Sequence, residues 1–252
     1  MIALITGSTA GIGKATAYKL AESKYNLILT GRRNDRLNAI KQDIEQKFFV
    51  KVITLCFDIR DKSACQNALL SLPKDWQQID VLVNNAGLAQ GLSTINNGLE
   101  EDWDTMIDTN IKGLLYVTKI VSNWMIERQK GHIINIGSIA GKEVYPNGNI
   151  YCATKHAVDA LNKAMRIEFL PYNIKVTGVH PGMVETEFSL VRFKGDVQRA
   201  KQTYTGLQPL LPEDIANTIA WIVQQPPHVN INEIVIMPTA QATTRDIIKK
   251  TN

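Results

Sequence analysis

Short apolar runs rich in Ile and Val recur along the chain, separated by longer segments with helical spacing. Seven of these runs are candidate strands: residues 2–6, 26–30, 50–55, 80–85, 132–137, 174–179 and 232–237. Several are apolar at consecutive positions, which indicates that both faces of the sheet are covered, as in parallel sheets flanked by helices. The alternation predicts an α/β doubly wound fold with a seven-stranded parallel sheet and helices on both faces.

The segments between these runs are long enough for one crossover helix each. We expect helices over residues 14–23, 34–46, 101–128, 151–168 and 213–224. One stretch breaks the rhythm: residues 183–211 mix polar, basic and aromatic positions without a clear period. An irregular insert at the carboxyl end of a strand is where substrate-covering loops occur. We therefore predict one Rossmann-type domain over residues 1–252, with a substrate-covering insert at about 183–211.

Composition narrows the class of protein. A chain of 252 residues is long enough for one large domain and short for two. The net charge of +4 comes from Lys and Arg spread along the chain, which disfavours nucleic-acid binding. Cys56, Cys65 and Cys152 are odd in number and lack metal-ligand spacing, so reduced thiols and no metal site are expected.

The first apolar run and the longest apolar stretches bear on location. The run at residues 1–6 lacks a basic leader and stops at Gly7, which is typical of a buried strand and not of a signal peptide. No stretch approaches the roughly 20 apolar residues of a membrane span. We therefore expect no membrane association and a cytoplasmic protein.

Three glycines follow the first candidate strand directly. They are Gly7, Gly11 and Gly13, spaced GxxxGxG within "TGSTAGIG". A tight turn there needs residues without a Cβ, and the following helix N-terminus offers free N–H groups to a pyrophosphate. A Walker A loop would need glycine in place of Ser8 and Ser or Thr in place of Ala15, so a dinucleotide is favoured. A purely structural strand-to-helix turn is the alternative.

Two arginines stand where a dinucleotide-binding chain usually carries an acid. Arg32 lies nineteen residues after Gly13, at the end of the second candidate strand. An acid there binds the ribose hydroxyls of NAD, whereas an arginine suits the 2′-phosphate of NADP through paired hydrogen bonds. We predict NADP as the cofactor, with Arg32 on the phosphate and Arg33 stacked on the adenine. The alternative is that both side chains are solvated at the start of the next helix.

Tyr151 and Lys155 are four residues apart at the start of a candidate helix, and thus on one face of it. Ser138 follows the fifth candidate strand at the carboxyl edge of the sheet. A carbonyl that accepts hydride develops negative charge on its oxygen, so it needs a proton donor and a hydrogen-bond donor, here Tyr151 and Ser138. An ammonium about 4 Å from the phenol favours the phenolate by roughly 4 kcal/mol at an effective dielectric of 20, so Lys155 should lower the pKa of Tyr151. An ordinary amphipathic helix start is the alternative.

These motifs together resemble the short-chain dehydrogenase/reductase family over essentially the whole chain. They are "TGSTAGIG" (6–13), "NNAG" (84–87), Asn110 in "DTNIKG", Ser138, "YCATK" (151–155) and "PGMVETEF" (181–188). The resemblance implies that Tyr151 is the general acid/base with Lys155 beneath it, and that Ser138 holds the substrate oxygen. It also implies that Asn110 positions a water in a proton relay.

The same resemblance implies the contacts with the cofactor and the assembly. Asp58 would touch the adenine and Asn85 the adenosine ribose, while Val184 and Thr186 would bind the nicotinamide amide. The complete set of expected NADP contacts is Gly7, Ser8, Thr9, Gly11, Ile12, Gly13, Arg32, Arg33, Asp58, Ile59, Asn85, Tyr151, Lys155, Pro181, Gly182, Val184 and Thr186. The family resemblance further implies a homotetramer built on the helices at 101–128 and 151–168.

Local sequence narrows the substrate class. "NNAGLAQG", "GHIINIGSIAGKEVYPNGN", "EFSLVRFKGD" and "HVNINEIVIMPTAQA" resemble the serine and 3-hydroxy acid dehydrogenase branch. That branch oxidises small 3-hydroxy acids such as serine, allo-threonine and 3-hydroxyisobutyrate, or reduces the related semialdehydes. The "PGMVETEF" loop is one small residue shorter than the branch pattern, which leaves the shape of the substrate pocket open.

A basic stretch in the insert offers a partner for a substrate carboxylate. It consists of Arg192, Lys194, Arg199 and Lys201, and Arg192 is the first choice. The alternative is that these cations are solvated or pair with Glu185 and Glu187. The four histidines, His132, His156, His180 and His228, match no metal or triad spacing and are expected to be structural.

Two other functions stay open from the sequence. One is a 3-oxoacyl thioester or general carbonyl reductase that uses the same proton relay on a larger substrate. The other, of a different class, is a regulator that senses NADP(H) without chemistry. Ser138, Tyr151 and Lys155 together disfavour the second, because a sensor has no need of all three.

Overall fold

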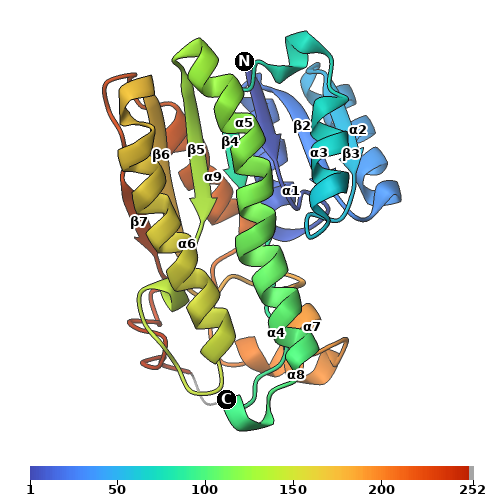
Figure 1. The fold of residues 1–252 in the computed structure, drawn as a ribbon. Coiled ribbons are helices and arrows are strands. Elements are labelled where there is room, and N and C mark those ends of the chain that lie inside the picture. Colours follow the sequence, from blue (N-terminus) through green and yellow to red (C-terminus); the bar gives the residue numbers. More distant parts are fainter. Residues whose placement is uncertain (250–252) are drawn as a thin grey trace.

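A sheet of seven parallel strands forms the centre of the computed structural model, which describes residues 1–249 (Figure 1). The strands are β1 (Ile2–Ile5), β2 (Asn26–Gly31), β3 (Val52–Cys56), β4 (Val81–Asn84), β5 (Gly131–Ile136), β6 (Ile174–Pro181) and β7 (Glu233–Ile236). Their order is β3-β2-β1-β4-β5-β6-β7, and all six pairings are parallel. The predicted doubly wound fold with a seven-stranded parallel sheet is confirmed.

Helices cover both faces of this sheet. They are α1 (Gly11–Glu22), α2 (Asn34–Phe48), α3 (Lys62–Leu70), α4 (Glu100–Ile107), α5 (Leu114–Arg128), α6 (Asn149–Glu168), α7 (Phe188–Arg192), α8 (Val197–Tyr204) and α9 (Pro212–Val223). Helices α1, α2 and α9 pack on one face, and α3, α5 and α6 on the other (Figure 1). The short α7 and α8 lie beyond the carboxyl ends of the strands.

Consecutive apolar residues in the strands serve two separate cores. In β1, Ala3 and Ile5 pack with the α1 side of the sheet, whereas Leu4 packs with the α5 side. In β2, Leu27 and Leu29 join the first core and Ile28 joins the second. Because successive side chains of a strand point to opposite faces, both positions must be apolar when both faces are covered.

The sequence pattern missed three features of the helices. The segment 101–128 is not one helix: a π-helical turn, Asp108–Gly113, separates α4 from α5. Helix α3 was not anticipated, and the aperiodic insert at 183–211 contains α7 and α8. These last two are five and eight residues long, too short for helical periodicity to appear in the sequence.

The carboxyl ends of the strands are the edge at which chemistry is expected. The strand order reverses between β1 and β4, and ligands of doubly wound sheets bind in the crevice at such a point. The glycine loop after β1, the segment after β4 and the segment after β5 all emerge at this edge. Among residues 1–249, no helix has the length and apolarity needed to cross a membrane.

Candidate functional site

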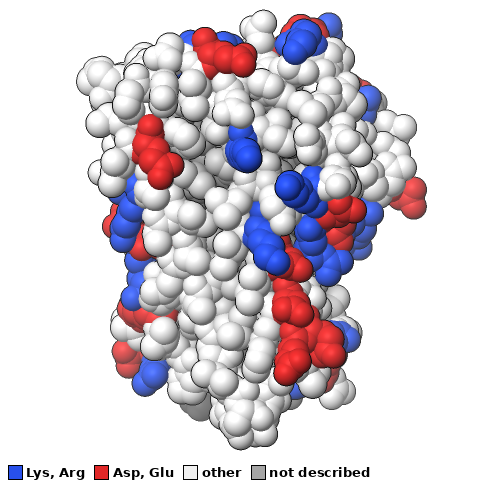
Figure 2. Space-filling model, viewed as in Figure 1, with Lys and Arg blue, Asp and Glu red and all other residues white. Residues whose placement is uncertain are grey.

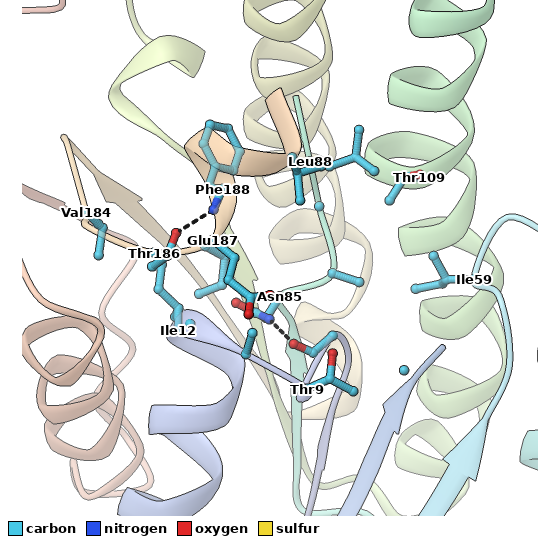
Figure 3. Close-up of a pocket in the computed structure, with 18 of the residues that line it drawn as sticks. Thr9, Ile12, Ile59, Asn85, Leu88, Thr109, Val184, Thr186, Glu187 and Phe188 are labelled. Atoms are coloured by element: carbon cyan, nitrogen blue, oxygen red, sulfur yellow. Dashed lines mark hydrogen bonds between the residues drawn. The ribbon is translucent and has the colours of Figure 1, made fainter. Parts of the chain in front are cut away.

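A cavity of about 360 Å³ opens at this edge and gathers most of the predicted site residues (Figure 3). Its walls come from the glycine loop, the ends of β2, β3, β4 and β5, helix α6 and the start of the insert. The predicted residues that line it are Gly7, Thr9, Gly11, Ile12, Arg32, Arg33, Asp58, Ile59, Asn85, Ser138, Tyr151, Lys155, Pro181, Gly182, Val184 and Thr186. Segments far apart in the chain thus converge on one site.

The glycine loop is shaped by close approaches that leave no room for side chains. Gly7 has φ +69° and Gly11 has φ +52°, a region that disfavours residues with a Cβ. A Cβ on Gly13 would lie 2.4 Å from the Asn85 Nδ2, which itself donates to the Thr6 carbonyl at 2.8 Å. No side chain caps the N-terminus of α1, so its backbone N–H groups remain available to an anion.

The arginine end of the cavity contains one loosely held and one tightly held guanidinium. Arg32 has a 57% exposed side chain, and its Nη1 lies 3.6 Å from Asp58, a carboxylate that Arg60 already binds at 2.6 Å. Arg33 donates from Nε and Nη2 to the Thr9 hydroxyl at 3.0 and 2.6 Å, and from Nη1 to Glu187 at 2.7 Å. Arg32 is therefore the freer of the two to bind a phosphate.

Tyr151 lies in the wall of the cavity, on the first turns of α6. Its ring packs edge-on against Phe188 of α7, with centroids 5.4 Å apart. Ser138, two residues after β5, accepts a hydrogen bond from the Ala140 amide at 3.1 Å, and its hydroxyl lies 3.5 Å from the Pro181 carbonyl. The strand end thus fixes the serine beside the tyrosine.

The side chains of Lys155 and Asn110 both lie close to Gly87. The Lys155 Nζ donates to the Ile136 carbonyl at 2.8 Å, and Asn110 exchanges two 2.8 Å hydrogen bonds with the Leu88 backbone. A Cβ added to Gly87 would lie 3.3 Å from the Asn110 Oδ1 and 3.5 Å from the Lys155 Nζ. Asn110 belongs to the π-helical turn, a distortion frequent at functional sites.

Burial dominates the electrostatics of this group. It raises the pKa of Tyr151 well above its usual value, although the charge of Arg192 and a hydrogen bond with Ser138 act to lower it. Burial likewise lowers the pKa of Lys155 to about 8. The expectation that Lys155 lowers the pKa of Tyr151 is not met here: Lys155 is not among the main groups that shift this pKa, and its Nζ binds the Ile136 carbonyl.

Arg192 reaches toward the tyrosine from the insert. Its Nη2 donates to the Tyr145 hydroxyl at 2.6 Å, and its Cζ lies 5.0 Å from the Tyr151 ring centroid. Its Nε is buried and has no hydrogen-bond partner among the described residues. The guanidinium therefore retains an unused donor next to the tyrosine.

Of the two alternatives for the insert's cations, solvation or pairing with Glu185 and Glu187, the pairing is wrong. Within residues 1–249, none of Arg192, Lys194, Arg199 and Lys201 forms an ion pair with Glu185 or Glu187. Lys194 instead binds Asp102 at 2.8 Å. Glu187 is bound by Arg33 and Arg36, because the insert folds back over the glycine loop toward the end of β2.

A few predicted residues do not line the cavity, and several lining residues were not predicted. Ser8 is fully buried and donates to the Ile5 carbonyl, while Gly13, Asn110 and Arg192 are adjacent to lining residues without lining the cavity themselves. Thr30, Gly31, Phe57, Leu88, Thr109, Glu187, Phe188 and Val191 line it without having been expected. Strand ends could have indicated Thr30 and Gly31; the insert's lack of period hid the last three.

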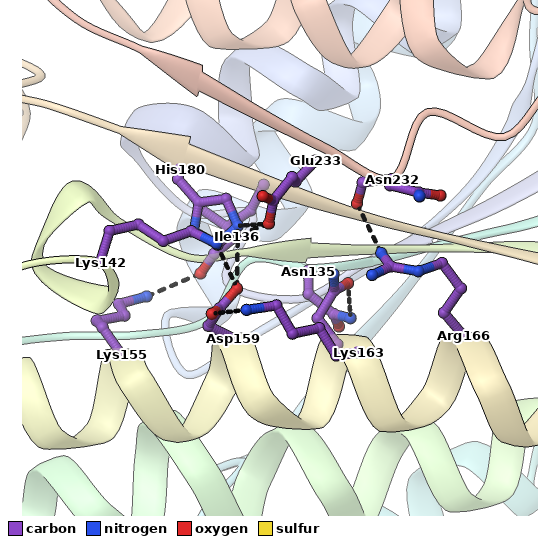
Figure 4. A network of polar contacts seen from close by, with 11 residues as sticks. Asn135, Ile136, Lys142, Lys155, Asp159, Lys163, Arg166, His180, Asn232 and Glu233 are labelled. Atoms are coloured by element: carbon purple, nitrogen blue, oxygen red, sulfur yellow. Dashed lines mark hydrogen bonds and ion pairs between the residues drawn. The ribbon is translucent and has the colours of Figure 1, made fainter.

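A second cluster of charged side chains lies beside the site, between α6 and β6 (Figure 4). Asp159 binds the Lys142 ammonium at 2.8 Å and the Lys163 ammonium at 2.7 Å. Lys142 also binds Glu233 at 2.6 Å, and the buried His180 Nε2 lies 3.6 Å from Asp159. Lys155, Asp159 and Lys163 are spaced by four and rise from the same side of α6 (Figure 4).

This cluster bears on the expectation that the histidines are structural. Asp159, His180 and Glu233 could together reach a metal ion, since their ligand atoms lie within 4.8 Å of one another. The Lys142 ammonium already supplies the positive charge between the two carboxylates. Burial lowers the pKa of His180 to about 4, so this ring is neutral at physiological pH. His132 binds the Thr177 hydroxyl at 2.8 Å inside the core.

Known proteins are similar to this chain over most of its length. The family model described as short chain dehydrogenase matches residues 1–195. The chain is 46% identical over 243 residues to the NADP-dependent 3-hydroxy acid dehydrogenase YdfG of Salmonella typhimurium, covering 96% of each protein. It is 48% identical over 241 residues to a probable NADP-dependent dehydrogenase of Haemophilus influenzae, covering 95% of this chain and 94% of that protein.

Solved structures give the same result at the level of the fold. The closed form of serine dehydrogenase complexed with NADP⁺ superposes with a TM-score of 0.92 at 42% identity, over 100% of both chains. The serine dehydrogenase from Escherichia coli gives a TM-score of 0.82 at 38% identity, over 96% of this chain and 100% of that one.

Proposed function

The chain belongs to the short-chain dehydrogenase/reductase family, and from that membership we propose that it is an NADP-dependent oxidoreductase acting on small 3-hydroxy acids. It oxidises the hydroxyl of serine, allo-threonine or 3-hydroxyisobutyrate type substrates, or reduces the corresponding semialdehydes. The observation that carries the proposal is the meeting of Ser138, Tyr151 and Lys155 with the glycine loop at one cavity. The names of the relatives supply the substrate class.

The proton steps follow from the positions of the side chains. In the reductive direction Tyr151 donates its proton to the substrate oxygen, and Ser138 donates a hydrogen bond to the same atom. Lys155 has one hydrogen bond, to Ile136, among the described residues, so two of its N–H groups can bind ribose hydroxyls and pass a proton onward. The π-helical Asn110 next to it positions a water that completes the relay. When bound, NADP(H) supplies or accepts the hydride.

The residues of the cavity suit a phosphorylated dinucleotide. The loop from Gly7 to Gly13 offers a concave backbone and the free N-terminus of α1 to the pyrophosphate. Arg32 binds the 2′-phosphate. Two observations support this: its side chain is 57% exposed, and the Asp58 carboxylate, 3.6 Å away, is already bound by Arg60. Asp58, Ile59 and Asn85 bind the adenosine half. Pro181, Gly182, Val184 and Thr186 bind the nicotinamide half, and Thr9, Ile12 and Arg33, which also line the cavity, add further contacts with the cofactor.

Substrate selection falls to Arg192 in this proposal. The hydrogen bond to Tyr145 holds the guanidinium beside the Tyr151 ring, and its Nε has no partner within residues 1–249. In a 3-hydroxy acid, one carbon separates the carboxylate from the carbon that bears the hydroxyl. Arg192 would bind the carboxylate while the hydroxyl contacts Tyr151 and Ser138. The insert at 183–211, part of a single domain with the rest of the chain, acts as the substrate cover.

We also propose a homotetramer and a cytoplasmic location. Few charged side chains occupy the face formed by α5 and α6 (Figure 2). Leu115 on α5 and Ile167 on α6 are 39% and 74% exposed there, which supports helix-to-helix contact between subunits. The three free cysteines, Cys56, Cys65 and Cys152, support a reducing compartment.

One substrate panel tests the proposal against its alternatives. Serine, 3-hydroxyisobutyrate, malonic semialdehyde and an acetoacetyl thioester are each offered with NADP(H) and with NAD(H). We expect turnover of the small acids with NADP(H) at the highest kcat/KM. Preference for the thioester would favour a 3-oxoacyl or general carbonyl reductase. Tight NADPH binding without turnover of any carbonyl would instead favour the sensing regulator.

A further inference from the structure

Glu187 joins the insert to the end of β2 through two ion pairs. Its Oε2 accepts from the Arg33 Nη1 at 2.7 Å, and its Oε1 accepts from the Arg36 Nη1 at 2.7 Å. The contacts link positions 154 and 151 residues apart in the chain. Each oxygen of one carboxylate thus binds a different arginine, and we call these three side chains the clasp.

Two members of the clasp border the cavity. Glu187 and Arg33 both line it, and Figure 3 shows Glu187 on the cavity side of the insert between Thr186 and Phe188. The preceding residue, Thr186, packs so closely on the glycine loop that a Cβ on Gly11 would lie 3.1 Å from its Cγ2. A ligand lying along the glycine loop would therefore have the insert against one of its sides.

Glu187 also fixes the start of α7, and with it the substrate side of the cavity. The next residue, Phe188, packs against Tyr151, and Arg192 ends the same helix. On the other side of the clasp, Arg33 binds the Thr9 hydroxyl with two further N–H groups. The clasp therefore ties the glycine loop, the end of β2 and α7 together.

We propose that Glu187 is a positioning residue: by binding Arg33 and Arg36 it holds the insert closed over bound NADP(H) and limits the rate at which the cofactor leaves. This inference uses only the cofactor part of the proposed function. Arg32, which the clasp does not engage, stays free for the 2′-phosphate. Recognition of the phosphate and closure of the insert are thus divided between neighbouring arginines.

The strength of the clasp suits a reversible closure. The side chains of Arg33, Arg36 and Glu187 are 43%, 48% and 40% exposed, so each ion pair is weak and is screened by salt. Burial acts to raise the pKa of Glu187, but hydrogen bonds from the two arginines outweigh it and keep the pKa below its usual value. The carboxylate is therefore charged, and the clasp present, at neutral pH.

The test measures dissociation of NADPH and of NADH by stopped-flow fluorescence, without substrate. Glu187→Gln should speed dissociation of both cofactors by a similar factor, about three- to tenfold, because the clasp contacts protein groups only. Arg36→Gln, which removes one arm, should give about a twofold effect. The double variant should dissociate no faster than Glu187→Gln alone, since both changes break the same contact. Glu187→Asp should restore part of the slow release.

Two matched controls separate the clasp from charge and phosphate effects. Glu185→Gln removes an exposed carboxylate of the same segment that has no ion pair within residues 1–249, and should leave both rates unchanged. Arg32→Ala should weaken NADPH and leave NADH unaffected. Raising the salt concentration should speed release from the wild type and from Glu185→Gln, and should have a smaller effect on Glu187→Gln.

Limited trypsin digestion gives a second readout that needs no cofactor. The insert contains Arg192, Lys194, Arg199 and Lys201, and the bond after Lys194 precedes Gly195 in an exposed turn. Glu187→Gln should be cleaved in the insert several-fold faster than Glu185→Gln, because the insert lifts more often.

Three outcomes would overturn the inference. Tighter NADPH binding by Glu187→Gln, with NADH unchanged, would make Glu187 a competitor of the 2′-phosphate for Arg33. Unchanged dissociation and digestion would make the ion pairs inert surface contacts. If the wild-type chain binds neither NADPH nor NADH, both the proposed cofactor and the proposed role of the clasp are rejected. By contrast, faster release by Glu187→Gln with no turnover of any 3-hydroxy acid would retain the clasp and reject only the proposed substrate.

Discussion

The acid/base chemistry of Tyr151 depends on which charges reach a buried phenol. Burial is the largest influence and keeps the hydroxyl protonated, whereas Arg192 and Ser138 act in the opposite direction. A protonated phenol is ready to donate in the reductive direction. For oxidation the same group must first lose its proton, so the two directions should respond differently to pH.

Replacing Tyr151 with Phe tests the central assignment. Loss of the proton donor should lower kcat by about 10²–10⁴-fold, the usual range for a general acid/base. The ring contact with Phe188 is retained, so NADPH affinity should change little. Steady-state kinetics and fluorescence titration measure the two effects. Near-normal turnover with unchanged NADPH affinity would show that another group moves the proton.

The pH profile follows from the raised pKa of Tyr151. Oxidation needs the phenolate, whose fraction grows with pH up to a pKa above the usual value, so kcat/KM for a 3-hydroxy acid should rise from pH 7 to pH 10. Reduction needs the protonated phenol, so kcat/KM for the semialdehyde should not rise between pH 7 and pH 10. Initial rates in both directions in one buffer series measure this. An oxidation rate that is flat or falls with pH would contradict the assignment of Tyr151 as base.

The pair Arg192 and Tyr145 should discriminate acids from neutral alcohols. Arg192→Ala removes the guanidinium and should raise KM for a 3-hydroxy acid about tenfold or more, with a smaller effect on a neutral alcohol of equal size. Tyr145→Phe should act in the same direction but more weakly, because it removes only the 2.6 Å hydrogen bond that orients Arg192. Equal effects of Arg192→Ala on both substrates would reject a carboxylate contact.

At the scale of elements, the sequence was most informative where burial imposes a pattern. All seven strands were predicted because both faces of the sheet are covered and Ile, Val and Leu fill consecutive positions. The same pattern located Ser138 and the glycine loop, since both follow strands directly. The register of Tyr151 and Lys155 on α6 also followed from their spacing.

Elements with weak local patterns could not be predicted. In the π-helical turn, Asn110 bonds the Leu88 backbone of another segment, a tertiary contact with no local signature. Likewise, the sequence offers only the insert's own cations as partners of Glu187, whereas Arg33 and Arg36 bind it from 154 and 151 residues away. The sequence predicts that Arg33 stacks on the adenine, and its contacts with Thr9 and Glu187 follow only from the three-dimensional structure.

The cluster around Asp159 should matter for stability. The Asp159 side chain is 10% exposed and binds both Lys142 and Lys163. Asp159→Asn removes this carboxylate and leaves Glu233 as the only acid bound to Lys142 among the described residues. Loss of this acid should lower the free energy of unfolding by about 2–3 kcal/mol, less than for a fully buried pair because Lys142 and Lys163 are 21% and 50% exposed. Urea denaturation measures this. Glu22→Gln, which breaks an exposed pair with Lys19, is the control and should cost under about 0.5 kcal/mol.

The outcome at Asp159 separates two roles of the cluster. If Asp159→Asn unfolds no more readily than Glu22→Gln, the cluster does not stabilise the junction of α6 and β6. If the variant is destabilised as expected, its NADPH affinity should still match that of the wild type at low temperature, because none of the cluster residues lines the cavity.

At the scale of the whole molecule, the sparsely charged face over α5 and α6 predicts association (Figure 2). Sedimentation of the wild type should give a tetramer. Leu115→Glu on α5 and Ala160→Glu on α6, both at exposed positions, should shift the chain to smaller species by placing unpaired charge in the contact. Phe49→Glu, at an 89% exposed position outside these helices, should not. A monomeric wild type would reject the tetramer and leave the cavity assignment untouched.

The stripe of Tyr151, Lys155, Asp159 and Lys163 along α6 has a consequence for how this chain can change over generations. One residue inserted or deleted early in α6 would rotate the positions on either side of it by about 100° relative to each other. Tyr151 and Lys155 face the cavity, whereas Asp159 and Lys163 belong to the charged cluster between α6 and β6. Such a change would therefore displace either the catalytic side chains or the ion pairs that hold the helix. Selection should therefore remove insertions and deletions in α6. New substrate preferences should arise through changes in the insert, because its length does not alter the orientation of the α6 side chains.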